Sequence, residues 1–276
     1  MSPFCHTPRN IRYCQGSVES NTAVAEKTFH IVLTVEEPLP VIRGGQFMML
    51  RLPKRTDPLL GRPLAVYRSS EHRIEALYVT AGKMTHRLAE VKRGELLNLW
   101  TPLGNGFPNN DVCHTILVAG GIGQTPFLLF VQQFTRQYGV EQNKKRLTLL
   151  YGAKTQSRIA GMDDFRQLGI EPMIATEDGS LGYSGFVTDL IQRVYGSGET
   201  TQVFCCGPMP MLHAAFSVTK NLSLPCYVSL ETPMSCGLGI CFGCAVKYKT
   251  ASDSDDWDYR RTCIDGPVFD AYRLVH

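Results

Sequence analysis

The stretch HTILVAGGIGQTP (residues 114–126) decides the fold of this chain. Its first part, HTILVAG, is a continuous apolar run, which is typical of a strand buried on both faces of a parallel sheet. Glycines 120, 121 and 123 follow, and FLLFVQQFTRQY (127–138) then has the apolar spacing of a helix. Glycine lets the backbone approach a pyrophosphate, and Pro126 suits the first helical turn. The stretch therefore predicts a nucleotide-binding strand, turn and helix.

The alternation of apolar strand and helix continues through residues 111–225. RLTLLYGA precedes MDDFRQLG, EPMIATED precedes FVTDLIQRVY, and TQVFCCG precedes PMPMLHAAFSVTK. Such repeats predict βαβ units around a parallel sheet, with ligands at the carboxyl edge of the strands. The turn at Cys206, Gly207 and Pro208 should therefore lie beside the first glycine turn and help to frame a dinucleotide. Cys206 is then either close to the reactive ring or an ordinary core thiol.

Residues 10–107 have a different pattern. Short β-prone runs occupy 29–35, 45–52, 73–80 and 95–100, turn residues bound them, and the one helical candidate is MTHRLAEV (84–91). This spacing predicts a small antiparallel barrel.

Two motifs lie within the predicted barrel. In GRPLAV (61–66), an arginine before a proline in extended chain can hold a phosphate, although a surface turn is the alternative. In YVTAGKMT (78–85), a strand ends and a helix begins at Thr85, which gives either an anion site or plain helix capping.

Four cysteines near the end of the chain indicate a metal centre. Cys236, Cys241 and Cys244 lie in SCGLGICFGC, and Cys263 follows in RTCIDGP. A C-x4-C-x2-C run with a distant fourth cysteine is the plant-type [2Fe–2S] pattern. A zinc site usually has two short-spaced pairs and fits less well. The other cysteines show no pairing pattern, and most are expected to be small core residues: Cys5, Cys14, Cys113, Cys205, Cys206 and Cys226.

Composition limits the remaining possibilities. The 276 residues suggest about two domains, and a net charge of +3 is too small to indicate nucleic-acid binding. No apolar run reaches the ~18 residues of a membrane span. Reduced cysteines and the absence of a secretory apolar segment at MSPFCHTPRN predict a cytoplasmic protein. The predicted division is a strand-rich domain over 1–110, an α/β domain over 111–225 and a cluster-binding segment over 226–276.

In their order and spacing, these motifs resemble the ferredoxin–NADP reductase superfamily. The cysteine set narrows the resemblance to the electron-transfer subunits of class 1B dihydroorotate dehydrogenase. The resemblance covers nearly the whole chain. The stretches that carry the resemblance are RPLAV, YVTAGKMT, VAGGIGQTP, TEDGSLGYSGFVTDL, FCCGPMPML and CIDGPVFDA. The implied fold is a β-barrel plus α/β architecture: an antiparallel flavin-binding barrel, a parallel-sheet nucleotide-binding domain and a small [2Fe–2S] segment.

The resemblance also implies which residues bind the cofactors. FAD and its phosphates would be lined by Arg62, Pro63, Leu64 and Ala65, and its ring and ribityl chain by Tyr78, Val79 and Thr80. Met84 and Thr85 would meet the pyrophosphate, and Gly82 is a further cofactor-binding residue. NAD would be framed by Gly120, Gly121, Gly123, Gly207 and Pro208, with Cys206 near the nicotinamide, and the cluster would be held by Cys236, Cys241, Cys244 and Cys263. The chain departs from the family at Ala65, where Ser or Thr is usual, and at Met84, where glycine is usual.

The implied reaction is electron transfer in pyrimidine biosynthesis. Dihydroorotate would be oxidised on a separate FMN-containing catalytic subunit, in a heterotetramer of two of each chain, and electrons would pass through the cluster and FAD to NAD+. No side chain is needed as a general acid or base, so Asp163 and Asp164 are expected to mark a helix start and Asp255 and Asp256 a solvated loop.

Two other functions and one choice of nucleotide stay open. The chain could be the reductase subunit of an anaerobic sulfite reductase or of a ferredoxin-dependent transhydrogenase. It could instead be a non-catalytic subunit with a four-cysteine zinc site. NADP is an alternative to NAD, since Lys154 and Arg158 could meet a 2′-phosphate or could be surface charges.

Overall fold

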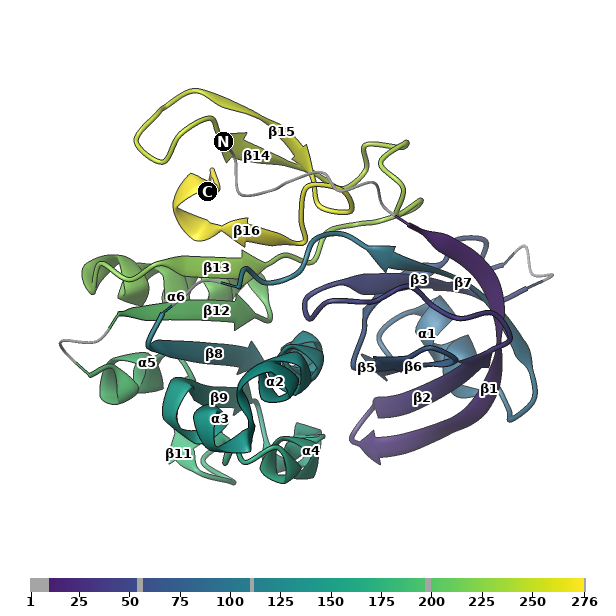
Figure 1. Cartoon of the computed structure of the whole chain (residues 1–276), viewed down its shortest axis with the longest axis horizontal. Coiled ribbons are helices and arrows are strands. Elements are labelled where there is room, and N and C mark those ends of the chain that lie inside the picture. The colour runs from purple at the N-terminus through teal and green to yellow at the C-terminus, as the bar shows by residue number, and fades with distance from the viewer. Residues whose placement is uncertain (1–9, 54–56, 110–111, 197–199, 276) are drawn as a thin grey trace.

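The computed structural model describes residues 10–53, 57–109, 112–196 and 200–275. Two seven-stranded sheets lie side by side, and a two-stranded sheet stands above them in the view of Figure 1. Cys5, most of the stretch predicted to lack a secretory signal, and the predicted domain boundary at residues 110–111 lie outside the described residues. Among the helices that the structure describes, none is long and apolar enough to cross a membrane.

The first sheet is antiparallel and curls into a half-barrel, as the strand-rich pattern predicts. Its strand order is β4-β3-β7-β1-β2-β6-β5, and β4 approaches β6 across the curl. The strands are β1 (Arg12–Ala25), β2 (Thr28–Val35), β3 (Phe47–Arg51), β4 (Arg62–Ala65), β5 (Arg68–Ser70), β6 (Arg73–Val79) and β7 (Leu96–Leu103), and the helix α1 is Lys83–Ala89.

The longest strand of the half-barrel, β1, was not predicted. Its sequence RYCQGSVESNTAVA is mostly polar and half-exposed, so it lacks the clean alternation that reveals a strand. Its position depends on pairing with both β2 and β7. Gly16 lies in its first half, where a Cβ would be 2.8 Å from Leu99 Cδ2.

The second sheet confirms the predicted α/β pattern. Its order is β11-β10-β9-β8-β12-β13-β16, with every described pair parallel except β13 and β16. The strands are β8 (His114–Gly120), β9 (Leu147–Ala153), β10 (Met173–Thr176), β11 (Tyr183–Ser184), β12 (Thr201–Cys206), β13 (Cys226–Ser229) and β16 (Val268–Asp270). The helices are α2 (Thr125–Tyr138), α3 (Val140–Arg146), α4 (Met162–Gln167), α5 (Asp189–Val194) and α6 (Met209–Asn221).

Helices cover both faces of this sheet because its central strands are apolar on both sides. In β8, Ile116 packs with the core beneath α5 and α6. The next residue, Leu117, packs with the core that contains Phe127 of α2 and Phe165 of α4. Three short 3-10 turns complete the elements: η1 (Gly121–Gln124), η2 (Gln156–Arg158) and η3 (Ala271–Arg273).

The C-terminal segment joins the two sheets. The hairpin of β14 (Ala245–Lys249) and β15 (Trp257–Arg261) forms the two-stranded sheet, whereas β16 extends the second sheet beside β13. Asn105, in the link between half-barrel and second sheet, donates to Asp265 O (3.1 Å) and Val268 O (2.8 Å). The segment therefore packs on both sheets, and its predicted limits at 226–276 stay a prediction.

Candidate functional site

The cysteine loop rests directly on the half-barrel. Cys244 and Cys263 are buried with their Sγ atoms 3.3 Å apart, and they share an apolar cluster with Phe47 and Met49 of β3. Trp100 of β7 donates its indole N–H to Cys236 O at 3.0 Å. Close approach is possible because Gly237 has φ +70° and no side chain, since a Cβ there would lie 2.7 Å from Met49 Cγ.

The loop presents backbone donors to sulfur. Leu238 N donates to Cys236 Sγ at 3.3 Å. Partial burial raises the pKa of Cys236, but backbone hydrogen bonds from Cys241, Leu238 and Ile240 outweigh it and lower this pKa to about 6. Backbone N–H groups aimed at a thiolate sulfur are what an iron–sulfur cluster requires of its loop.

The buried pair requires a cation. Burial, followed by the neighbouring Cys244 thiol, raises the pKa of Cys263 to about 12. A positive charge beside this thiol, such as a bound metal ion supplies, favours loss of its proton. In the part of the chain that the structure describes, no group of three or more His, Cys, Asp or Glu side chains surrounds a single point. The fit to a binuclear cluster rests on the donor set: four cysteines supply two thiolates for each iron, and the loop aims a backbone N–H group at Cys236 Sγ.

The Arg-Pro motif forms the edge strand β4. It pairs with β3, and Phe47 lies opposite Ala65 in the ladder. The Arg62 side chain is exposed and donates to the carbonyls of Gly61 (3.0 Å) and Leu60 (3.4 Å). No ion pair joins it to a carboxylate among the described residues, which leaves this guanidinium available to a phosphate.

Three of the residues predicted to line the flavin have buried side chains. The side chains of Leu64, Tyr78 and Met84 lie in the half-barrel core, because strand alternation and the inner face of α1 direct them inward. Tyr78 also donates its hydroxyl to Asn21 Oδ1 at 3.0 Å. A flavin contact at these three residues would therefore be made through the backbone, and it stays a prediction. Pro63, Ala65, Val79 and Thr80 are half-buried and Gly82 is exposed, so these remain predicted contacts.

Thr85 caps its own helix. Its hydroxyl accepts from Ala81 N (2.9 Å) and Gly82 N (3.0 Å), which is the capping alternative considered from the sequence. A pyrophosphate contact at this residue stays a prediction.

The two glycine turns of the second sheet meet at its carboxyl edge. A Cβ on Gly123 would lie 2.1 Å from Cys206 O, and one on Gly207 would lie 3.0 Å from Gly120 N. Gly121 has φ +54° with open space around it. The structure thus brings the predicted nucleotide turns into backbone contact, which only glycine permits at these positions.

Cys206 ends β12 beside this contact. Burial raises the pKa of Cys206 to about 12, although a hydrogen bond with Ser229 opposes the rise. A raised pKa favours the neutral thiol, which suits packing against a ring. Its predicted proximity to nicotinamide stays a prediction.

One of the two candidate 2′-phosphate ligands is already engaged. Arg158 pairs with Glu26 of the half-barrel at 3.4 Å, and Ser157 Oγ donates to Glu26 at 2.6 Å. Lys154 is exposed.

Sequence reasoning missed the residues that join the parts of the site. Trp100 and Asn105 fix the cysteine segment, and Tyr67 with Asp164 joins the two sheets at 2.5 Å. Asp163 and Asp164 do begin α4 as predicted, and Asp255 and Asp256 are exposed. The positions of Tyr67 and Asp164, 97 residues apart, carry no local signal of their contact.

Comparison with known proteins agrees with this geometry. Residues 231–275 match the model of the iron–sulfur cluster binding domain of dihydroorotate dehydrogenase B, and residues 117–216 match the oxidoreductase NAD-binding domain. A solved NADH-dependent reduced ferredoxin–NADP oxidoreductase chain is 23% identical, with a TM-score of 0.80 over 94% of this chain and 89% of that chain. The solved structure confirms the predicted fold, and the two family models confirm the predicted iron–sulfur cluster and NAD at the level of domains.

Two similar relatives cover the chain almost completely. One, from Caldanaerobacter subterraneus subsp. tengcongensis, is 32% identical over 95% of this chain and 98% of its own length. The other, from Bacillus caldolyticus, is 33% identical over 94% of this chain and 97% of its own length. Both are named dihydroorotate dehydrogenase B (NAD+), electron transfer subunit. With the cysteine loop on a flavin-type half-barrel, they show that this chain belongs to the family of electron transfer subunits of NAD+-dependent dihydroorotate dehydrogenase B.

Proposed function

We propose that this chain carries electrons from an FMN-containing dihydroorotate dehydrogenase catalytic subunit to NAD+ in pyrimidine biosynthesis. Electrons enter at a [2Fe–2S] cluster on Cys236, Cys241, Cys244 and Cys263 and leave from FAD on the half-barrel. FAD exchanges electrons singly or in pairs, so it joins a one-electron cluster to a two-electron nicotinamide. The proposal places the reaction in the cytoplasm.

The observation that carries the proposal is the short route between the two cofactor sites. The buried Cys244 and Cys263 pack with Phe47, and Phe47 lies opposite Ala65 of the flavin motif. One side chain thus separates the cluster thiols from the strand proposed to hold the flavin. Such a route suits electron transfer and has no use in an ordinary structural zinc site.

The chain's own residues supply binding and orientation. Arg62 would pair with an FAD phosphate, and the half-buried Pro63, Ala65, Val79 and Thr80 would border the ring. The backbone at Ala65 would replace the hydroxyl that the family usually has there. The glycine turns would hold NAD, and the neutral Cys206 thiol would pack beside its nicotinamide.

The exposed apolar loop around the cluster is the proposed docking surface for the catalytic subunit. Leu238, Ile240 and Phe242 are 42%, 77% and 58% exposed, and they lie on the loop that carries Cys236, Cys241 and Cys244. Exposed apolar side chains clustered in this way mark protein interfaces. A partner there would exclude water from the cluster and bring its FMN close. The proposed assembly contains two copies of each chain.

The visible spectrum and metal content of the purified chain test the cofactor assignment. Flavin bands, a cluster shoulder and equal amounts of iron and sulfide are expected. A colourless protein with one zinc would overturn the proposal in favour of a structural subunit.

Co-purification at native levels tests the partner. An FMN-binding subunit is expected, in a complex whose sedimentation mass corresponds to two of each chain. Ile240→Asp should abolish the association, whereas Val41→Asp, at an apolar half-barrel position that is 87% exposed, should leave it unchanged. A sirohaem subunit as the partner would support the sulfite reductase alternative instead.

A further inference from the structure

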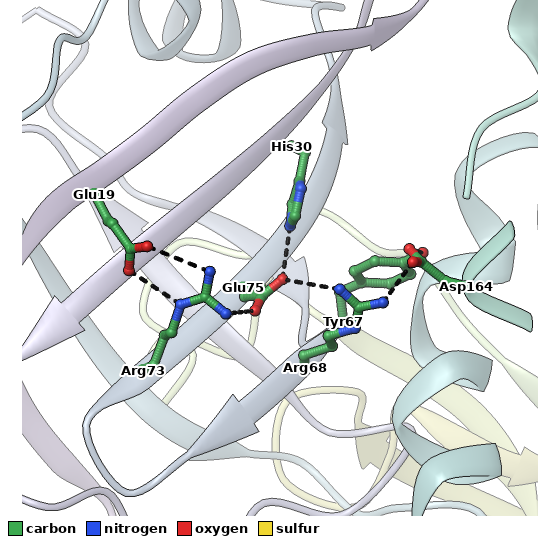
Figure 2. Close-up of polar contacts among 7 residues, drawn as sticks. All are labelled: Glu19, His30, Tyr67, Arg68, Arg73, Glu75 and Asp164. Carbon is green, nitrogen blue, oxygen red and sulfur yellow. Dashed lines mark hydrogen bonds and ion pairs between the residues drawn. The ribbon is translucent and has the colours of Figure 1, made fainter. Parts of the chain in front are cut away.

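A network of hydrogen bonds and ion pairs crosses the interface between the half-barrel and α4 (Figure 2). Tyr67 follows the flavin strand β4 by two residues and donates its hydroxyl to Asp164 Oδ2 at 2.5 Å. The next residue, Arg68, pairs with Asp164 Oδ1 at 2.5 Å. Both oxygens of one carboxylate on the second domain are therefore held by neighbouring residues of the half-barrel.

Tyr67 belongs to the core of the other domain. Its ring is 1% exposed and packs in the cluster that contains Phe127, Tyr151 and Phe165. Burial, and then the hydrogen bond to Asp164, raises the pKa of Tyr67 well above its ordinary value. The hydroxyl is thus a permanent donor, and its direction is fixed by the ring.

Arg68 is held from its other side. Glu75 Oε2 lies 3.7 Å from Arg68 Nη1 and 2.8 Å from His30 Nε2, and Glu75 also pairs with Arg73. Burial would raise the pKa of Glu75, but the His30 hydrogen bond and the nearby arginines lower it. Because the charged Glu75 is only 2% exposed, Arg68 has a fixed partner and does not swing into solvent.

The nucleotide turn reaches the same point. Gly161, which precedes α4 with φ +74°, leaves no room for a side chain, since a Cβ would lie 2.5 Å from Tyr67 Oη and 3.2 Å from Gln124 Nε2. Gln124 ends the glycine turn η1, is fully buried, and has no partner for either amide atom among the described residues. The end of the flavin strand, the start of α4 and the nucleotide turn therefore converge on the Tyr67 hydroxyl.

We propose that Asp164 is a positioning residue that, through Tyr67 and Arg68, sets the distance between the flavin strand β4 and the nucleotide turn η1. In the step that it serves, NADH loses a hydride with both electrons to become NAD+, and FAD gains that hydride and is reduced; the physiological direction is the reverse. Such transfers require the reacting atoms within ~3–3.5 Å, and a misplacement of ~1 Å can lower the rate about a hundredfold. The inference rests on the proposed function.

A second contact between the half-barrel and this part of the second domain should keep the structural effect of losing the Asp164 contact local. Glu26 N donates to Ser157 O at 2.8 Å, so the segment that precedes α4 is also attached to the half-barrel at its other end. Loss of the Asp164 contact alone should therefore tilt α4 and η1 against the half-barrel without separating the two domains.

Asp164→Asn tests the inference in the full chain with its cofactors. Stopped-flow reduction of FAD by saturating NADH, without oxygen, should slow by about tenfold to a hundredfold. The NADH concentration at half-saturation should stay within about twofold, and deuterated NADH should slow the step further. Tyr67→Phe keeps the ring and removes only the hydroxyl donor. It should likewise lower the limiting rate and leave the half-saturating NADH concentration nearly unchanged. Asp163→Asn is the matched control, because within the described part of the chain that exposed neighbour pairs only with Arg166 of its own helix, and the variant should behave as the unaltered chain.

Hydrogen–deuterium exchange supplies a measure independent of activity. In Asp164→Asn, backbone amides of residues 155–167 should exchange faster, whereas the flavin and cluster spectra should be unchanged. The inference is overturned if the limiting rate equals that of Asp163→Asn, if the rate falls only in proportion to lost FAD, or if exchange does not change. An unaltered chain that binds no FAD, or that NADH cannot reduce, would overturn the proposed function itself.

Discussion

Gly123 offers a sharp test of the nucleotide site. A methyl group at this position would lie 2.1 Å from Cys206 O and 2.9 Å from Gly207 N, and both atoms are backbone. Ordinary contacts between carbon and a carbonyl oxygen are about 3.3 Å, so Gly123→Ala must separate the two glycine turns by roughly 1 Å. We expect the rate of FAD reduction by NADH to fall about a hundredfold, and stability to fall by about 1–3 kcal/mol from overpacking.

Gly121→Ala in the same turn is the control that separates the effect of moving the two glycine turns apart from the effect of backbone strain. Gly121 has φ +54°, which is unfavourable for alanine by ~1–2 kcal/mol, but among the described residues no heavy atom beyond Gly121 and its two chain neighbours lies within 4 Å of its Cβ position. Urea unfolding should therefore show similar losses of stability in both variants, whereas stopped-flow reduction should slow markedly only in Gly123→Ala. Equal reduction rates for the two variants would refute the argument that backbone contact between the turns positions the nucleotide.

Three further changes have defined outcomes. Cys263→Ser should lose iron and sulfide yet retain FAD, while Cys113→Ser, at an exposed thiol, should keep all three; a full cluster in Cys263→Ser would contradict the ligand assignment. Gly104→Ala places a methyl group 2.4 Å from Pro267 Cδ at φ +70°, and it should lower the urea midpoint by an amount equivalent to ~2–4 kcal/mol, whereas Gly82→Ala, with open space around it, should not. The folded-state pKa of Glu75 lies below the ordinary 4.5, so its charge stabilises the fold above about pH 4.5 and this contribution is lost as the pH falls further. Glu75→Gln should therefore lower the free energy of unfolding by ~1–3 kcal/mol at pH 7, and this free energy should fall less steeply as the pH drops into the acid range. An unchanged dependence of stability on pH would count against the network.

Local pattern was enough to predict the two sheets and the cysteine centre. The change from short β-prone runs to alternating strand and helix is visible in the sequence because each element must bury its own apolar face. The four cysteines were identifiable because ligand spacing is set by the cluster rather than by the rest of the fold. The glycine turns were likewise predicted to meet, since parallel strands share one carboxyl edge.

Contacts between distant segments could not be predicted in this way. Strand β1 is polar along most of its length and owes its place to two neighbouring strands. The inward direction of Tyr78 depends on the register of β6, which a one-residue shift would reverse, and that of Met84 depends on how α1 is rotated against the half-barrel. Asp164 was interpreted as a helix start, and that is correct, but its bond with Tyr67 depends on how two separately formed domains pack.

The central claim is that this chain converts single electrons into a hydride on NAD+. Anaerobic titration of the purified chain with NADH, followed together by visible absorption and electron paramagnetic resonance, tests it most directly. We predict that the flavin bands bleach and that the signal of a reduced [2Fe–2S] cluster appears in the same titration, with two electrons taken by the flavin and one by the cluster. Flavin bleaching with no cluster signal, in a chain whose cluster dithionite does reduce, would contradict the account.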